Sequence, residues 1–119
     1  FKTIRPEELA FVKDFDFGKK IAYVYGRCLP STELQMHCLI YRFRLDVGAV
    51  FHLHDYKIME SAEKIKIPIT KVTEAGTVKI GYDVLKVMGD KGIAVMKDHG
   101  IVAIGRSMKE AGDIILKYH

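Results

Sequence analysis

This chain lacks the features that mark several common classes of protein. No apolar run approaches the roughly 20 residues that a membrane-spanning helix needs, and no signal-peptide pattern opens the sequence. Only two cysteines occur, Cys28 and Cys38, and their spacing matches no metal-binding or redox motif. We therefore expect a protein with reduced thiols, located in the cytoplasm and without a membrane partner.

The excess of positive charge is also small. The formal net charge is +4, and the lysines are scattered through the chain instead of forming a block. Nucleic acid is therefore not an expected partner, whereas a weak positive field would suit a small anionic substrate. The 119 residues contain no internal repeat, low-complexity segment or domain boundary. We expect residues 1–119 to form one domain.

The first half of the chain predicts a hairpin followed by a helix. Residues 10–15 and 20–25 are typical of two strands joined by a turn. Thr32 and Gln35 have the spacing of a capping box, which predicts a helix from there to about residue 45. An apolar stripe on this helix is expected to face the core, and it consists of Leu34, Cys38, Tyr41 and Leu45.

The second half predicts a continued alternation of helices and strands. Residues 65–70 resemble an edge strand because they contain Pro68. Two apolar runs near residues 93–104 predict a hairpin in which Gly100 supplies a positive φ. The other expected elements are a strand over residues 47–51, helices over 55–64 and 77–88, and a last helix capped by Ser107 and Glu110. This order predicts an α/β protein, with three α/β/α layers and a mixed, largely antiparallel central sheet.

Two histidines at the end of the strand near residue 50 are the first candidate functional residues. His52 and His54 are two positions apart, so on a strand they project to the same face. Two imidazoles on one face can share a metal ion. His99, in the turn of the predicted hairpin, would complete a three-imidazole site with an open position, as in catalytic metal centres. Zinc suits imidazole ligands, although manganese, iron and cobalt remain alternatives.

A second candidate group lies at the start of the helix near residue 32. Glu33 is in the first turn, where the helix dipole favours a negative charge. Ser31 and Thr32 offer hydroxyls beside the helix N-terminal amides, which together could bind an anion. Taken alone, these residues have a simpler interpretation, in which Thr32 caps the helix and Glu33 complements its dipole.

Taken together, these motifs resemble the central signature of the class II aldolase/adducin family. The similarity covers residues 30–37, a Tyr-Arg-x-Arg helix, residues 46–54 and the segment from His99 to Arg106, in the family's order. The resemblance implies that His52, His54 and His99 bind a divalent metal, most simply Zn²⁺. It also implies that Glu33 is the catalytic acid/base residue and that Ser31 and Thr32 contact a substrate phosphate.

The function implied by the resemblance is that of a metal-dependent aldolase, an aldehyde-lyase that cleaves a small phosphorylated ketose through an enediolate. Family aldolases are cyclic tetramers, so a homo-oligomer is expected. Family members usually begin with a helix and a glycine- and asparagine-rich loop, and we expect this first third to be missing here, so that the domain is N-terminally shortened. An alternative is therefore an inactive or shortened metal-binding or structural module, as in adducin.

Overall fold

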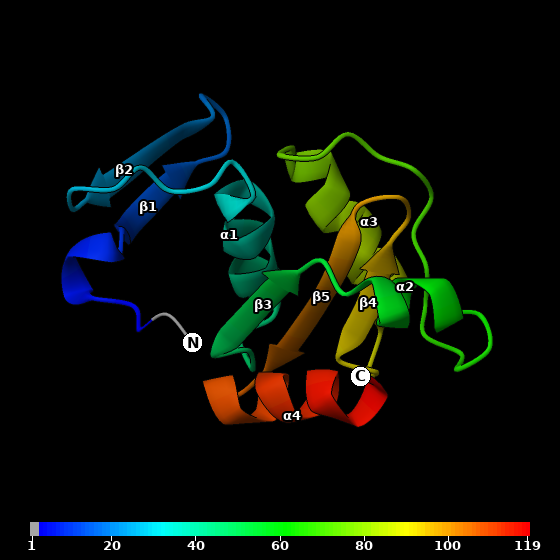
Figure 1. The fold of residues 1–119 in the computed structure, drawn as a ribbon. Helices are drawn as coiled ribbons and strands as arrows, with labels where there is room; N and C mark the ends of the chain where they lie inside the picture. The colour runs from blue at the N-terminus through cyan, green and yellow to red at the C-terminus, as the bar shows by residue number, and fades with distance from the viewer. Residues whose placement is uncertain (1–2) are drawn as a thin grey trace.

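The computed structural model describes residues 3–119 and places helices on both faces of a small sheet (Figure 1). Among these residues, no helix is long and apolar enough to cross a membrane. The α/β class predicted from the sequence is confirmed. In chain order the elements are η1 (Pro6–Glu8), β1 (Phe11–Asp16), β2 (Ile21–Tyr25), α1 (Leu34–Phe43), β3 (Ala49–Leu53), α2 (Tyr56–Ser61), α3 (Val78–Met88), β4 (Ile93–Met96), β5 (Gly100–Gly105) and α4 (Met108–Tyr118).

The central sheet has three strands in the order β3-β5-β4, and both strand pairs are antiparallel. The middle strand, β5, is buried over residues 100–104 because neighbouring strands and helices surround it. This explains its continuous apolar sequence. One parallel bridge, between Ile69 and Val95, extends the sheet beyond β4. The sheet is therefore largely antiparallel with one parallel contact, as the sequence predicted.

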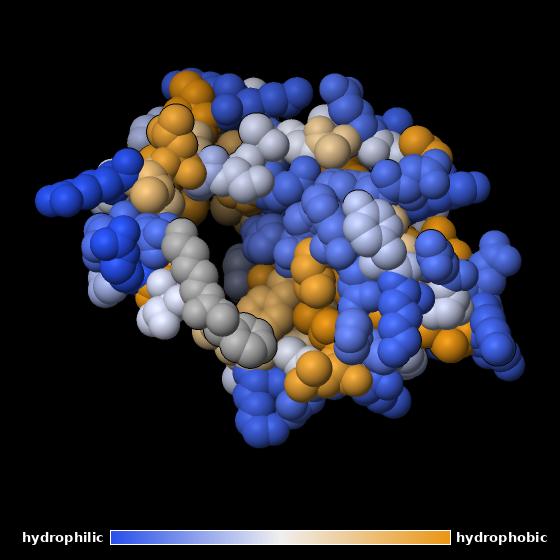
Figure 2. All heavy atoms as spheres, viewed as in Figure 1, coloured by the Kyte–Doolittle hydropathy of each residue, from blue (hydrophilic) through white to orange (hydrophobic). Residues whose placement is uncertain are grey.

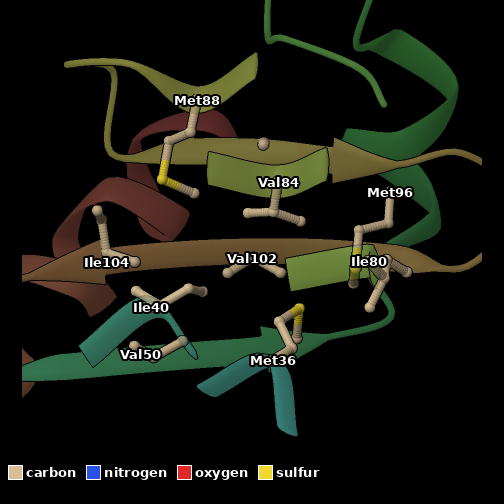
Figure 3. Close-up of a cluster of buried hydrophobic side chains, with 10 residues drawn as sticks. Met36, Ile40, Val50, Ile80, Val84, Met88, Met96, Val102 and Ile104 are labelled. Carbon is tan, nitrogen blue, oxygen red and sulfur yellow. The ribbon is translucent and has the colours of Figure 1, made fainter. Parts of the chain in front are cut away.

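Alternation of side chains along the strands divides the core into two clusters and gives the fold its three layers. The cluster between the sheet and the helices α1 and α3 (Figure 3) contains Met36, Ile40, Val50, Ile80, Val84, Met88, Ala94, Met96, Val102 and Ile104. The cluster on the opposite face, toward α2 and α4, contains Ile58, Ala62, Ile67, Ile93, Val95, Ile101, Ala103 and Ile115. Because Val50 faces α1 and α3, residue 52 on the same strand lies on that face as well.

The strands β1 and β2 form a separate antiparallel hairpin, as predicted, with a register shift between Val12 and Asp14. This hairpin exposes aromatic and aliphatic side chains, which Figure 2 shows as orange and tan atoms gathered over it. The exposed apolar residues of its two strands are Phe11, Ile21, Tyr23 and Tyr25. Apolar groups of this size in solvent mark a surface that another chain or segment can cover.

The prediction for α1 was right about the existence of the helix and wrong about its details. The helix begins at Leu34, and neither Thr32 nor Glu33 caps it through a side chain. The Gln35 amide instead donates a hydrogen bond of 2.7 Å to the carbonyl of Gly76. The predicted core stripe was also wrong, because the helix ends at Phe43 and leaves Leu45 93% exposed. The buried residues of α1 are Met36, Leu39 and Ile40.

Two predictions for the second half of the chain also need correction. Residues 65–70 form no regular strand; they make only the bridge at Ile69, and the carbonyl of Pro68 accepts from the amide of Val95 at 2.8 Å. In the β4–β5 turn, the positive φ of 59° belongs to Asp98, not to Gly100. Gly100 is the first residue of β5, where the lack of a side chain leaves room for the rings of His52 and His54.

Candidate metal centre and active site

The structure brings His52, His54 and His99 together at one end of the sheet. His52 lies in β3, His54 follows it, and His99 lies in the turn before β5. The antiparallel pairing of β3 with β5 places Leu53 opposite Ile101, so the two ends meet. One nitrogen from each imidazole lies within 4.8 Å of the others, a spacing that could hold a metal ion.

A hydrogen bond fixes the ring of His52 in an orientation that suits a metal ligand. Its Nδ1 lies 3.0 Å from the carbonyl oxygen of Ile101. A carbonyl can only accept, so Nδ1 carries the hydrogen and Nε2 retains its lone pair. Burial lowers the pKa of His52, and the neighbouring His99 and His54 lower it further, against the Ile101 hydrogen bond and Glu33, which raise it. The neutral imidazole that binds metals is therefore the favoured form.

Gly100 allows the first two imidazoles to approach the backbone of β5. A Cβ atom at this position would lie 2.7 Å from Cδ2 of His54 and 2.8 Å from Cε1 of His52. It would also lie 2.8 Å from the carbonyl oxygen of Leu53. Contacts this short are not tolerated between carbon and backbone atoms, so any other residue at position 100 would displace the histidines.

Glu33 reaches the same place from the start of α1. Its Oε1 lies 3.8 Å from Nε2 of His99. Among residues 3–119, only two buried side-chain atoms have no hydrogen-bond partner, and these are Oε2 of Glu33 and Nδ1 of His99. Buried polar atoms are almost always satisfied, so two orphaned atoms at one site indicate a ligand that the polypeptide does not supply. The donor set of three imidazoles beside a carboxylate fits a divalent cation.

Ser31 and Thr32 complete the cleft, which we call the metal cleft. It has a volume of about 370 Å³, and its walls are Ser31, Thr32, Glu33, His52, Leu53, His54 and His99. All six residues singled out from the sequence therefore line one cleft, together with Leu53. No lysine or arginine belongs to the walls that the structure describes, so a bound anion would meet hydroxyls and the imidazoles but no permanent cation.

The predicted anion cradle at the start of α1 is smaller than expected. The amide of Leu34 donates to the carbonyl of Ser31 at 3.0 Å, and the amide of Gln35 donates to the carbonyl of Thr32 at 3.4 Å. The amide of Glu33 donates to Oγ of Ser31 at 3.2 Å. These three amides are occupied within the turn, and the two hydroxyl groups are the side-chain donors that Ser31 and Thr32 offer to a phosphate.

Sequence reasoning missed the loop that packs against Thr32 and Glu33. Gly76 has a φ of 69°, and a Cβ atom there would lie 2.7 Å from Oγ1 of Thr32 and 3.9 Å from Oε1 of Glu33. The hydrogen bond from Gln35 fixes this loop. The glycine at position 76 was a signal for close backbone approach, but the sequence did not say which residues it would contact.

Known proteins share sequence similarity with this chain. Residues 1–118 match the family described as "Class II Aldolase and Adducin N-terminal domain". The chain is similar to L-fuculose phosphate aldolase of Methanocaldococcus jannaschii, with 28% identity over 97 residues that cover 69% of this chain and 52% of that protein. An L-fuculose phosphate aldolase of Methanococcus maripaludis strain C5 is 26% identical over 121 residues, which cover 87% of this chain and 65% of that protein.

Solved structures show the same fold. A structure of L-fuculose 1-phosphate aldolase superposes with a TM-score of 0.72 at 23% sequence identity, covering 87% of this chain and 55% of that one. A sugar-phosphate aldolase from Thermotoga maritima superposes with a TM-score of 0.67 at 19% identity, covering 82% and 53%. The chain spans 52% of the first of the two curated relatives and 65% of the second.

Proposed function

This chain belongs to the class II aldolase and adducin family, and we propose on that basis that it is a metal-dependent aldehyde-lyase acting on a small phosphorylated ketose. The observation that carries the proposal is the position of Glu33. Its carboxylate shares one cleft with three imidazoles, and one of its oxygens is buried without a partner. Deprotonation of a carbon next to a carbonyl needs a base and a Lewis acid, and a carboxylate beside a metal site supplies both.

We propose that His52, His54 and His99 hold one divalent ion, with Zn²⁺ the best match for three imidazole ligands. When bound, such an ion supplies Lewis-acid polarisation of carbonyl and hydroxyl oxygens. The contribution of the chain itself is orientation. The Ile101 carbonyl directs Nε2 of His52 toward the site, and Gly100 leaves room for the rings of His52 and His54.

Glu33 is proposed to move the proton. When the carbon–carbon bond of the ketose breaks, the carboxylate of Glu33 takes the proton of the hydroxyl on the carbon that becomes the aldehyde. The electron pair of the broken bond remains on the carbon next to the carbonyl, as an enediolate. Glu33, now in its acid form, delivers the proton to that carbon, and in the reverse direction its carboxylate removes the same proton. Ser31 and Thr32 would donate hydrogen bonds to the phosphate. The absence of a cation among the described walls of the cleft means that they would hold it weakly.

A second candidate function is a binding or structural module that keeps the metal and has lost catalysis. The limited phosphate contacts favour it, because no lysine or arginine belongs to the described walls of the metal cleft. We further propose that the protein is a homotetramer and that it is located in the cytoplasm. Its substrate is proposed as a class, a small phosphorylated ketose.

The test is elemental analysis of the purified protein, combined with a cleavage assay on a panel of ketose phosphates. The lyase proposal expects one divalent ion per chain and release of an aldehyde from at least one compound. Metal without turnover on any compound would favour the binding module. A protein that neither contains nor takes up a divalent ion would contradict both.

A further inference from the structure

We propose that Asp55 and His119 act as positioning residues for the proposed metal ligand His54, an inference that rests on the proposed function. Asp55 is the N-cap of α2 and His119 the C-cap of α4, and we call the contact between them the α2–α4 latch. Nδ1 of His119 lies 2.6 Å from Oδ2 of Asp55. A carboxylate oxygen accepts, so Nδ1 carries the hydrogen and donates it in both charge states of the ring.

Of the three proposed ligands, His54 has the least support from its own surroundings. Its side chain is exposed, whereas those of His52 and His99 are partly buried. Within the part of the chain that the structure describes, the ring of His54 makes no hydrogen bond and contacts only the rings of His52 and His99. The ring of His52, by contrast, is held by the carbonyl of Ile101. The position of His54 therefore depends on its backbone.

The latch holds this backbone from the side opposite to the ring of His54. His54 shares a site with His52, so the alternation of side chains continues past the end of β3. Phe51 and Leu53 pack on the core cluster that faces α2 and α4. Asp55 continues their side of the chain, since its backbone is still extended, with φ −99° and ψ 98°. Fixing Asp55 thus limits rotation of the chain at the preceding residue.

The environment of Asp55 distinguishes the latch from an ordinary surface ion pair. Exposed pairs contribute little because solvent screens them, but the side chain of Asp55 is only 10% exposed. Its other oxygen, Oδ1, accepts from the amide of Ile58 at 3.1 Å, so both carboxylate oxygens have a partner. A second hydrogen bond joins the same two helices, because Nζ of Lys57 donates to the backbone carbonyl of His119 at 2.8 Å.

His119→Ala removes only the ring from the latch. The amide of residue 119 can still donate to the carbonyl of Ile115, and its carbonyl can still accept from Lys57. Titration of the metal-free protein with Co²⁺ should show an affinity about tenfold lower, at the low end of the roughly 10–100-fold effects of outer-shell changes. The visible spectrum of bound Co²⁺ should shift because its ligands move. His119→Asn places a donor near the position of Nδ1 and should restore both.

Two further variants separate the latch from local helix stability. In Asp55→Ser, a hydroxyl still caps α2, but the shorter side chain loses the contact with His119. This variant should therefore reproduce the effect of His119→Ala on Co²⁺ binding. Lys109→Ala is the matched control, because it breaks an ion pair with Asp113 that lies entirely within α4. It should leave the affinity and the spectrum unchanged.

Hydrogen exchange of the metal-free protein gives a readout that needs neither metal nor turnover. A peptide covering residues 53–58, followed by mass spectrometry, should exchange several-fold faster in His119→Ala than in the parent or in Lys109→Ala. If the parent binds no Co²⁺, the proposed function fails, and this difference in exchange still upholds the latch.

Two results would overturn the inference. One is an unchanged exchange of residues 53–58 in both His119→Ala and Asp55→Ser, which would mean that the latch does not hold this segment. The other is a faster exchange in these variants, combined with the Co²⁺ affinity and spectrum of the parent. In that case the segment would be held by the latch, but the position of His54 in the metal site would not depend on it.

Discussion

The carboxylate of Glu33 lies 3.8 Å from Nε2 of His99, although 66 positions separate the two residues in the chain and they belong to different layers of the fold. One comes from the N-terminal end of α1, and the other from the turn between two strands of the sheet. Both have a buried polar atom without a partner. This contact places the proposed proton-transfer group next to the proposed metal site. A substitution can remove either residue and leave the other in place.

Replacing Glu33 by Gln separates catalysis from structure. The amide keeps the shape of the side chain but cannot carry the proton, and a positioned general base contributes about 10²–10⁴-fold in rate. We expect Glu33→Gln to fold and retain metal, and to lose activity by this factor on any ketose phosphate that the parent cleaves. Steady-state kinetics measures the loss of activity. Glu63→Gln is the control, because Glu63 is exposed. If Glu33 only complements the helix dipole, the change should instead cost about 0.3–1 kcal/mol of stability and leave the rate unchanged.

Removing His99 should weaken metal binding severely. It is one of three proposed protein ligands, and its loss should exceed the about 10–100-fold that outer-shell changes cost. Titration of the metal-free protein with Co²⁺, followed by absorbance, gives the affinities of the parent and of His99→Ala. His37→Ala is the control, since His37 is partly buried and lies outside the group of three. Tight, stoichiometric binding in a His52→Ala/His99→Ala double variant would rule out the site.

The sequence predicted which residues line the metal cleft better than it predicted which contacts hold them in place. His52 and His54 were accessible to sequence reasoning because side chains two apart on a strand share a face. Their pairing with His99 followed from the resemblance and from the predicted turn. No local pattern could show that Gln35 would bond to Gly76, because that contact joins the start of α1 to a loop more than 40 residues away.

The errors in α1 have a similar origin. This helix carries two apolar stripes, and periodicity alone could not decide which one meets the sheet. The choice was made by Met36 and Ile40, which pack against Val50 and Val102. Gly100 was recognised as special, but for the wrong reason: turns favour positive φ, and the constraint here is instead the space taken by His52 and His54.

The exposed apolar surface predicts self-association. Leu45 is 93% exposed, Leu29 91% and Phe43 56%, and isolated domains rarely leave so many large apolar side chains in water. We predict a homo-oligomer, specifically a tetramer, measurable by light scattering coupled to size-exclusion chromatography. Leu45→Glu should shift the protein toward smaller species without unfolding it, because the side chain of Leu45 is almost fully exposed. A parent that elutes as a clean monomer at micromolar concentration would contradict this.

The pH dependence of stability should report the burial of His37. Burial lowers its pKa below the value of 6.5 expected for an exposed histidine, so near that pH the unfolded chain binds more protons than the folded one. Its contribution to the free energy of unfolding is therefore complete above about pH 6.5 and is lost as the pH falls through the folded pKa. Urea titrations of the metal-free protein between about pH 5 and pH 7 should show a shallower pH dependence for His37→Gln than for the parent. The slope of the free energy of unfolding against pH should fall in His37→Gln but should not reach zero. The pKa of His52 is lowered as well, so His52 contributes part of the slope.

Gly100→Ala tests whether the site depends on close packing of its ligands. The added methyl would meet the rings of both His52 and His54 at less than 3 Å. A metal site loses affinity when its ligands move by a fraction of an ångström. We expect Co²⁺ affinity to fall at least about tenfold, with a changed visible spectrum that reports altered coordination.

Gly89→Ala is the matched control: its φ of 51° makes the substitution strained, but no atom lies within 4 Å of the added Cβ. That variant should lose about 1–3 kcal/mol of stability and keep its metal affinity. If both variants lose stability and neither loses metal affinity, then Gly100 serves the fold alone and the two histidines tolerate displacement.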